Sequence, residues 1–396
     1  ITCSGKRSGK VAREITDKGF CSTKGIYYYG LKLHLLGFRR IGKLPHPEQI
    51  LFTPASVNDV TVFKEAWSGI VNRTFWGDKI YFVNELNEQM LKHQNSEMLT
   101  PVKAVKGMPT QRIAVANGHD PHTIHATCRA AAENLVDVIL VGDSDRVKSL
   151  EDEHDLDTAN IKIIDKRDTK EAGIVARDMV RNGDADILMK GLMPSDLYMR
   201  LILDKENGLL PKGNILSHVA VMEIKSYPKL LFVSDVAVIP QPDLSQKVQM
   251  LNYTIEIAHK FGIEEPKAAI LAATEKVSDK MPATMEAATI AKMASRGQIK
   301  GAIVDGPLAF DIAVNKEACE IKGFESPVGG DADILIFPNI ESGNIFFKTI
   351  TKLAGGSLAA LVAGTTSPCI LTSRADSEDS KYYSIAMAAI MGCKDA

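Results

Sequence analysis

The chain has 396 residues, of which 45% are apolar and 24% are charged, and its net charge is −2. This length predicts two or three domains, and this composition is typical of globular proteins and excludes a disordered or fibrous chain. No apolar run reaches the roughly 18 residues of a membrane helix, and the first residues lack the apolar segment of a signal peptide. The six cysteines form no C-x-x-C pair, which argues against a zinc site or a disulfide framework. We therefore expect a cytoplasmic protein without a metal site.

The first quarter of the chain differs in charge from the rest. Residues 1–108 hold 16 Lys and Arg against 9 Asp and Glu, a net charge of +7, whereas the later residues hold 31 against 40, a net charge of −9. A basic segment suggests a present or past nucleic-acid partner. Within it, apolar and aromatic runs predict strands around 26–38, 49–53 and 78–83 and a helix around 58–69. The polar residues 84–108 predict a further helix followed by a linker.

Three segments of this quarter resemble the catalytic region of insertion-sequence transposases of the DDE type. They are GFCSTKGIYYYGLKLHLLGF (19–38), LFTPASVNDVTVFKEAW (51–67) and FWGDKIY (75–81). The resemblance implies a ribonuclease H-like α+β fold in which three carboxylates hold two metal ions. Asp78 alone fits one of those positions, so we expect residues 1–108 to be a truncated transposase fragment without turnover. The alternative is that the fragment contributes DNA or protein binding.

After residue 109, short apolar runs alternate with segments of helical spacing. This alternation predicts an α/β fold of parallel sheets covered by helices, in which ligands bind beyond the carboxyl ends of the strands. The predicted strands are 112–116, 136–142, 160–165, 185–190, 229–238, 267–273, 301–305 and 332–337. The predicted helices are 120–134, 168–181, 195–206, 243–261, 284–296, 311–321, 342–354 and 378–391.

Four longer stretches of this part carry a family resemblance. They are ILMKGLMPSDLYMRLIL (187–203), LSHVAVMEI with LLFVSDVAV (216–238), KMPATMEAATIAKMASRGQIKGAIVDGPLAFD (280–311), and GGDADILIFPNIESGN with ILTSRADSEDSKYYSIA (329–344 and 370–386). In this order they resemble the phosphate acetyl/butyryltransferase family, and the third stretch favours its butyryl branch. The resemblance implies two domains of the isocitrate/isopropylmalate dehydrogenase-like type with the active site in the cleft between them. The expected domains are 109–211 plus 365–396, and 212–364.

The segment from Ser373 to Asp376 lies where an apolar run ends and a helix is predicted to begin. Asp376 or Ser377 would cap that helix. A helix N-terminus beside an arginine is an anion site, because free N–H groups and a planar guanidinium both match phosphate. In isolation such a motif is more often a capped surface helix with an incidental arginine. With the family resemblance it predicts Ser373, Arg374 and Asp376 as catalytic residues.

Further candidates lie at or just beyond the ends of predicted strands. Lys190 and Gly191 follow a buried strand, and a glycine lets the backbone approach a ligand closely. The resemblance implies that Arg200, on the next helix, binds phosphate or the coenzyme. Turn residues end two later strands; each turn alone is unremarkable in sequence, but together they predict the rim of a cleft. The predicted substrate-binding residues are Lys190, Gly191, Arg200, Asp305, Gly306, Pro307, Gly343 and Asn344.

The resemblance implies reversible transfer of a butyryl or similar short acyl group between coenzyme A, as a substrate, and inorganic phosphate. We expect a homo-oligomer without a tightly bound cofactor. Direct attack in a ternary complex is expected, because no cysteine or serine has an evident base beside it. Adjacent Ser217 and His218 point to opposite faces of a strand, so they are not expected to act as a nucleophile and base.

The identity of the general base stays open at the level of sequence. Asp376 is the first candidate for the group that takes the proton of the coenzyme A thiol. In acetyl relatives the base stands further along, and an ungapped match falls on Ser380, so Asp305 and Asp379 are alternatives. Three other functions compete with the butyryl assignment. They are a phosphate acetyltransferase, a decarboxylating dehydrogenase, and a DNA-binding fusion that acts through the basic quarter.

Overall fold

The computed structural model divides the chain into two compact units, Ile1–Ala104 and Val105–Ala396, and we treat each by itself. The described residues are 17–21, 26–40, 43–54, 61, 65, 74–76, 97–99, 110–154, 156–224, 226–373 and 376–392.

The first unit contains an antiparallel sheet of three strands in the order β1-β2-β3 and a separate parallel pair, β4 with β5. These strands are Asp17–Cys21, Ile26–Arg40, Lys43–Pro54, Thr74–Trp76 and Glu97–Leu99. The strands predicted around 26–38 and 49–53 are confirmed as parts of β2 and β3. The predicted strand at 78–83, with Asp78, lies outside the described residues, as does nearly all of the predicted helix at 58–69.

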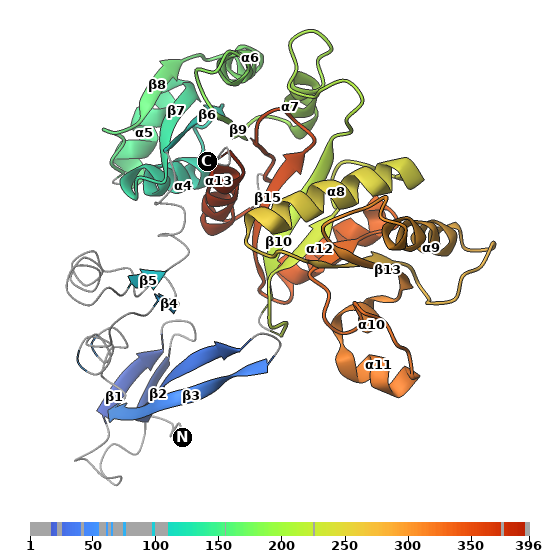
Figure 1. Ribbon diagram of the computed structural model, residues 1–396. Helices are drawn as coiled ribbons and strands as arrows, with labels where there is room; N and C mark the ends of the chain where they lie inside the picture. The colour runs from blue at the N-terminus through green and yellow to red at the C-terminus, as the bar shows by residue number, and fades with distance from the viewer. Residues whose placement is uncertain are drawn as a thin grey trace. The chain divides into compact units, whose positions relative to one another are not determined.

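The second unit contains a single sheet of eleven strands in the order β13-β12-β14-β11-β10-β15-β16-β9-β6-β7-β8. In Figure 1, β6, β7 and β8 lie together on one side of this unit and β13 lies on the other. The first four strands of the sheet in sequence are β6 (Gln111–Ala116), β7 (Val136–Gly142), β8 (Lys162–Asp165) and β9 (Ile187–Lys190). The others are β10 (Ser217–Glu223), β11 (Leu231–Ser234), β12 (Lys267–Leu271), β13 (Ile303–Leu308), β14 (Ile334–Ile336), β15 (Ser357–Ala363) and β16 (Cys369–Ile370).

Helices cover both faces of this sheet, as the alternating strands require. One face packs on α4 (Pro121–Ala132), α5 (Ser144–His154), α8 (Leu244–Lys260), α9 (Pro282–Ser295) and α13 (Glu378–Gly392). The other face packs on α6 (Thr169–Arg181), α7 (Ser195–Ile202), α10 (Phe310–Val314) and α12 (Ile340–Lys352), with the short α11 (Lys316–Lys322) beside α10. The α/β class is therefore confirmed.

The expectation of purely parallel sheets is wrong, because the sheet is mixed. Two parallel groups, β9-β6-β7-β8 and β11-β14-β12-β13, are joined through β10 and β15, which pair antiparallel with each other. β10 is also antiparallel to β11, and β15 to β16. Only short loops separate β10 from β11 and β15 from β16, and short loops permit antiparallel but not parallel pairing. The predicted strand ranges included neither β10 nor β15, although Ser217 and His218, the first residues of β10, were expected to lie on a strand.

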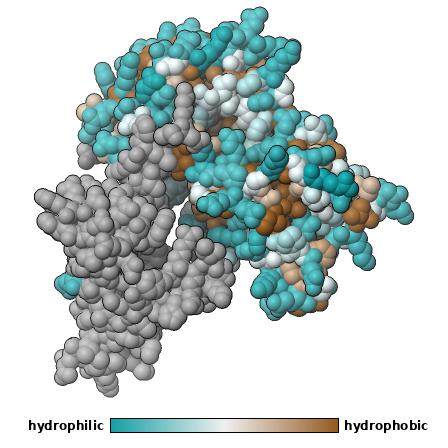
Figure 2. Space-filling view, in the orientation of Figure 1, coloured by the Kyte–Doolittle hydropathy of each residue, from teal (hydrophilic) through white to brown (hydrophobic). Residues whose placement is uncertain are grey.

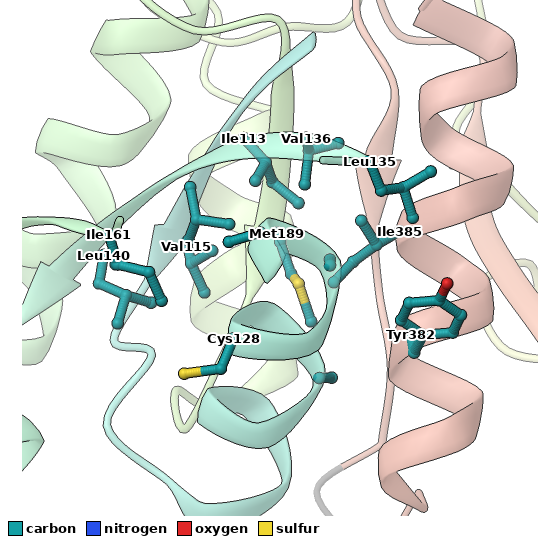
Figure 3. Close-up of a cluster of buried hydrophobic side chains, with 14 of the residues drawn as sticks. Ile113, Val115, Cys128, Leu135, Val136, Leu140, Ile161, Met189, Tyr382 and Ile385 are labelled. Atoms are coloured by element: carbon teal, nitrogen blue, oxygen red, sulfur yellow. The ribbon is translucent and has the colours of Figure 1, made fainter. Parts of the chain in front are cut away.

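The C-terminal helix α13 packs against α4, far from it in sequence. Tyr382 and Ile385 lie in the same buried cluster as Ile113, Val115 and Leu140 of the first strands (Figure 3).

Polar contacts reinforce this packing. The guanidinium of Arg129 lies 3.7 Å from the ring centroid of Tyr382 and 2.9 Å from the carboxylate of Asp379, and the Tyr382 hydroxyl donates to Glu133. The end of the chain thus completes the core that begins with β6.

Most predicted helices after residue 109 are confirmed within a few residues of their ends, with two differences. The predicted helix at 311–321 is two helices, because Asn315 leaves the helical conformation and caps α11 through the N–H of Ala318. α5 was not predicted, since its sequence SDRVKSLEDEH buries only Val147 and Leu150.

Figure 2 shows a mostly hydrophilic surface on the visible face of the described residues, with scattered apolar patches. Among the helices that the structure describes, none combines the length and apolarity that crossing a bilayer requires.

Deleting residues 1–108 should leave the second unit folded. The four buried apolar clusters that the described residues of this unit form begin at Ile113, and a domain with its own core folds alone. In a calorimetric comparison with the full chain, the melting temperature of 109–396 should move by less than about 4 °C. An insoluble fragment, or one without a cooperative transition, would show that the first quarter is integral to the fold.

Candidate functional site

A pocket of about 320 Å³ lies on the middle strands of the sheet, on the face that α7 and α12 cover. Its base is formed by side chains from β10, β15 and the segment after β16, and α7 and α12 form its walls. The segment that follows β11 closes one end. The lining residues are Ser195, Met199, His218, Val236, Ala237, Asn344, Phe347, Lys348, Ala360, Leu371, Thr372, Ser373 and Asp376.

Two of the three predicted catalytic residues meet in this pocket. Ser373 donates its backbone N–H to Oδ2 of Asp376 at 2.7 Å, and the N–H of Asp376 donates back to the carbonyl of Ser373. This turn holds both residues just before α13, whose first turn is capped by the hydroxyl of Ser377. Asp376 is buried. Arg374, the third, lies outside the described residues.

The face of α12 that borders the pocket carries Asn344, Phe347 and Lys348, at the i, i+3, i+4 spacing that brings helical side chains together. The Asn344 amide donates to the carbonyl of Val236 at 2.9 Å, which ties α12 to the end of β11. The Lys348 ammonium lies 5.1 Å from the ring centroid of Phe347, a cation–π contact, and makes no ion pair with a described carboxylate. This exposed ammonium is available to an anion.

Gly343 explains how closely α12 approaches the sheet. A Cβ atom at this position would lie 2.2 Å from the carbonyl oxygen of Asp235, so any side chain here would push the helix away. The sequence-based prediction placed Gly343 in the substrate-binding set, but its described contact is with the backbone after β11.

Asp235 organises the base of the pocket. Its buried carboxylate accepts the hydroxyl of Ser217 and the backbone N–H groups of His218, Ala237 and Val238, at 2.7 to 3.0 Å. Four donors satisfy the charge that burial would otherwise penalise. The cluster fixes the start of β10 against the end of β11.

His218 lines the pocket although Ser217 does not, as opposite faces of a strand require. Its imidazole packs edge-on against Phe347, with ring centroids 6.2 Å apart. Burial lowers the pKa of His218, and the nearby Asp235 carboxylate and a hydrogen bond to the backbone of Leu371 oppose this shift only in part. The ring is therefore neutral near pH 7, and its Nδ1 has no hydrogen-bond partner among the described residues.

A buried lysine lies behind the pocket. The Nζ atom of Lys381, on α13, is 3.5 Å from Oγ1 of Thr372. Burial lowers the pKa of Lys381, while the carboxylates of Asp120 and Asp376 act in the opposite direction. Asp120 caps α4 through the N–H of Thr123. The pocket thus borders a polar interior that connects α4 with α13.

Three predicted binding residues near β9 do not line the pocket. Lys190 is buried, and its ammonium donates to the carbonyls of Gly191 and Met193. Gly191 allows a close crossing of strand ends, since a Cβ there would lie 2.3 Å from the carbonyl oxygen of Asn117. Arg200 is 80% exposed and lies 4.0 Å from the carboxylate of Asp196, although its neighbour Met199 borders the pocket.

The two alternative bases lie elsewhere, and the predicted turn at Asp305–Pro307 is wrong, because these residues continue β13 to Leu308. Asp305 is on β13, the edge strand at the far end of the sheet from β16, and bonds to the hydroxyl of Ser326 and the N–H of Gly306. Gly306 and Pro307 do not line the pocket either. Asp379 is mostly exposed and pairs with Arg129.

The sequence analysis did not predict several of the residues that line the pocket, and the sequence patterns that could have revealed them differ in strength. Phe347 and Lys348 follow the predicted Asn344 at helical spacing, which was a usable signal. Met199, Val236, Ala360 and Leu371 are ordinary apolar residues of core elements, and only the gap between α7 and α12 distinguishes them.

The described cysteine thiols are unsuited to covalent catalysis. Burial raises the pKa of Cys128 to about 11 and that of Cys369 to about 12. Burial also raises the pKa of Cys319. Since the thiolate is the nucleophile, these residues are unreactive at neutral pH. In the part of the chain that the structure describes, no three His, Cys, Asp or Glu side chains gather as a metal site would need.

Comparisons with known proteins agree with the sequence resemblance. Residues 98–175 and 167–389 match the family model described as phosphate acetyl/butaryl transferase. A phosphate butyryltransferase of Clostridium acetobutylicum is 41% identical over 290 residues, 73% of this chain and 96% of the relative. A phosphate acetyltransferase of Thermotoga maritima is 43% identical over 280 residues, 71% of this chain and 95% of the relative.

A solved structure is similar over the same region. It is a branched-chain phosphotransacylase from Enterococcus faecalis, which is 30% identical, with a TM-score of 0.63 over 72% of this chain and 99% of that one. The family match and these relatives cover nearly the whole of the second unit, so the chain is a phosphate acyltransferase and belongs to the phosphate acetyl/butaryl transferase family.

Proposed function

We propose that the protein is a phosphate butyryltransferase, which moves a butyryl or similar short acyl group reversibly between coenzyme A and inorganic phosphate. One structural observation supports this proposal in addition to family membership. Ser373 and Asp376, predicted from sequence, share a pocket with Asn344, His218 and Lys348, which come from distant parts of the chain. The pocket combines cationic and hydrogen-bonding groups with an apolar base, as an anionic substrate with a short hydrocarbon tail requires.

The phosphate is held at the mouth of the pocket in this proposal. Two anionic reactants must meet there, so the site has to neutralise charge and orient both. Lys348, at the exposed edge, supplies one positive charge. Arg374 and the N-terminus of α13 supply a guanidinium fork and backbone N–H groups, and the assignment of Arg374 rests on the sequence.

The chemical step is a direct displacement. A phosphate oxygen attacks the thioester carbonyl carbon, a carbon–oxygen bond forms, and after the tetrahedral intermediate the carbon–sulfur bond breaks. Ser373 donates a hydrogen bond to the developing oxyanion. Asp376 takes up the proton that the attacking hydrogen phosphate loses and passes it to the departing thiolate; in the reverse direction the Asp376 carboxylate removes the thiol proton and returns it to the phosphate. The raised pKa values of the described thiols support a mechanism without an acyl-cysteine.

The architecture of the proposed enzyme extends the sequence interpretation. We retain two domains, 109–211 plus 365–396 and 212–364, with the site at their junction. The lining residues support this, because α7 and the segment after β16 come from the first and β10, α12 and β15 from the second. The isocitrate/isopropylmalate dehydrogenase-like ancestry, the homo-oligomer and the substrate-binding roles of Lys190, Arg200 and Asp305 remain predictions from sequence.

For residues 1–108 we keep the interpretation of a transposase-like segment that contributes nothing to the acyl transfer. It rests on the sequence alone.

Phosphate acetyltransferase is the second candidate function for residues 109–396, because the Thermotoga maritima relative carries that name at 43% identity.

Release of coenzyme A should depend on phosphate and should favour four-carbon acyl groups over acetyl. The preference follows from the apolar base of the pocket, where each methylene contributes roughly 1–3 kcal/mol. The measurement is the initial rate of thiol release from acetyl-, butyryl- and isobutyryl-CoA, with sulfate replacing phosphate as the control. A preference for acetyl-CoA of tenfold or more would favour the acetyltransferase assignment instead.

Asp376→Asn should lower kcat by at least about a hundredfold, the usual contribution of a general acid–base group. The asparagine side chain can still accept the N–H of Ser373, so the turn is kept and only the proton-transferring group is lost. Asp305→Asn and Asp379→Asn should retain most of the rate, because neither residue lines the pocket. Near-normal turnover of Asp376→Asn, with a large loss in either of the others, would move the base to that residue.

Arg374→Ala should reduce kcat/KM by about a hundredfold or more, since it removes a charge-assisted bidentate contact to phosphate. Arg374→Lys should recover only part of the loss, because an ammonium lacks the planar fork. Arg296→Ala, an exposed arginine at the end of α9, is the matched control. Saturation curves in phosphate separate the two possibilities: an unchanged KM for phosphate in Arg374→Ala would place the anion elsewhere.

A further inference from the structure

The residues at the base of the pocket differ in polarity from those at its mouth. Four apolar side chains, Val236, Phe347, Ala360 and Leu371, are each less than 9% exposed and form part of the base. Two polar residues at the base also bond within the protein: one ring nitrogen of His218 bonds to the backbone of Leu371, and Asp376 accepts the N–H of Ser373, while Nδ1 of His218 has no partner among the described residues. A hydrocarbon chain that enters the pocket therefore finds an apolar surface below the polar groups at its mouth.

Ala360 is the smallest of the four side chains, and the strand pairing fixes which way it points. On β15 it lies directly opposite Ala220 of β10. On the other side of β15, Val362 pairs with Cys369 of the antiparallel β16. Two residues away from this pair, in opposite chain directions, Ala360 lies opposite Leu371. Side chains alternate along a strand and match across it, so Ala360 and Leu371 face the same side of the sheet. Ala360 thus occupies the sheet surface between the walls formed by α7 and α12.

We propose that Ala360 determines the acyl-chain length that the enzyme accepts, because its methyl group leaves the depth that a four-carbon chain needs, and that Leu371 beside it limits longer chains. This inference rests on the proposed function and deepens it, since it assigns the acyl subsite to residues that no sequence motif distinguishes. An acetyl group ends nearer the reacting carbonyl, so it does not depend on this depth.

The proposal predicts a loss that is selective for the longer substrate. Ala360→Val adds two carbon atoms on the sheet surface and should shorten the apolar base. One methylene in such a pocket changes kcat/KM by roughly 10–200-fold. The ratio of kcat/KM for butyryl-CoA to that for acetyl-CoA should therefore fall by about tenfold or more, because butyryl-CoA loses more activity than acetyl-CoA.

Ala220→Val is the matched control. Ala220 is fully buried, lies opposite Ala360 in the same apolar cluster, and does not line the pocket. The same added volume there strains the same layer of the core, so a merely structural effect would lower the rates with both substrates together and leave their ratio within about twofold.

Leu371→Ala tests the proposal in the opposite direction, because it should favour the longer acyl chain. This test does not depend on whether Ala360→Val folds. Removing the larger side chain should raise the ratio of kcat/KM for hexanoyl-CoA to that for butyryl-CoA by about tenfold. The rates with both substrates can fall in this variant, because Leu371 lies next to Thr372 and Ser373. A loss common to both substrates cancels in the ratio of the two kcat/KM values.

The outcomes separate this inference from the proposed function. A wild-type protein that releases no coenzyme A from any of the three substrates in phosphate removes the proposed function itself. A wild-type protein that is active, with substrate ratios unchanged in both Ala360→Val and Leu371→Ala, keeps the proposed function and overturns the assignment of the acyl subsite. A shift in Ala220→Val as large as in Ala360→Val would also overturn it.

Discussion

The reversal of strand direction at the centre of the sheet is the constraint on which the pocket depends. A parallel group lies on each side, and β10 and β15 join the groups by antiparallel pairing. Each parallel group carries its own covering helices, so α7 belongs to one group and α12 to the other. Between these helices the sheet surface at His218 and Ala360 is left open to the pocket. A binding site at a change of topology is the general behaviour of open α/β sheets.

Polar contacts fix the elements around the pocket relative to one another. Asp235, with four donors, locks the end of β11 to the start of β10. Gly343 lets α12 reach the same place, and Asn344 then bonds to the carbonyl of Val236. The bonds of Asp235 to Ser217 and His218 are buried and the others are partly buried, so bulk water screens them less than surface contacts. They act as the support for the residues that face the substrate.

The last helix connects the core of the second unit with the pocket. α13 packs on α4 through Tyr382 and Ile385, while the turn before it carries Ser373 and Asp376 into the pocket. Correct placement of the proposed catalytic groups therefore requires that the end of the chain return to the first strands. Lys381, buried on the same helix, approaches Thr372 at the base of the pocket, so the core of α13 and the site are continuous.

The amino-acid sequence by itself determined the α/β class and most helices and strands after residue 109, and it predicted Ser373, Asp376 and Asn344 as site residues, which the structure places in one pocket. These depend on local patterns: apolar runs, helical spacing and turn residues beside strand ends. Tertiary structure alone decided the antiparallel β10 and β15, because a buried strand has the same apolar pattern in either direction. It also decided that His218, Lys348 and Ala360 face one pocket while Asp305 does not. Residues at successive strand ends share a site only if strand order and direction bring those ends together, and that order is a property of the whole sheet.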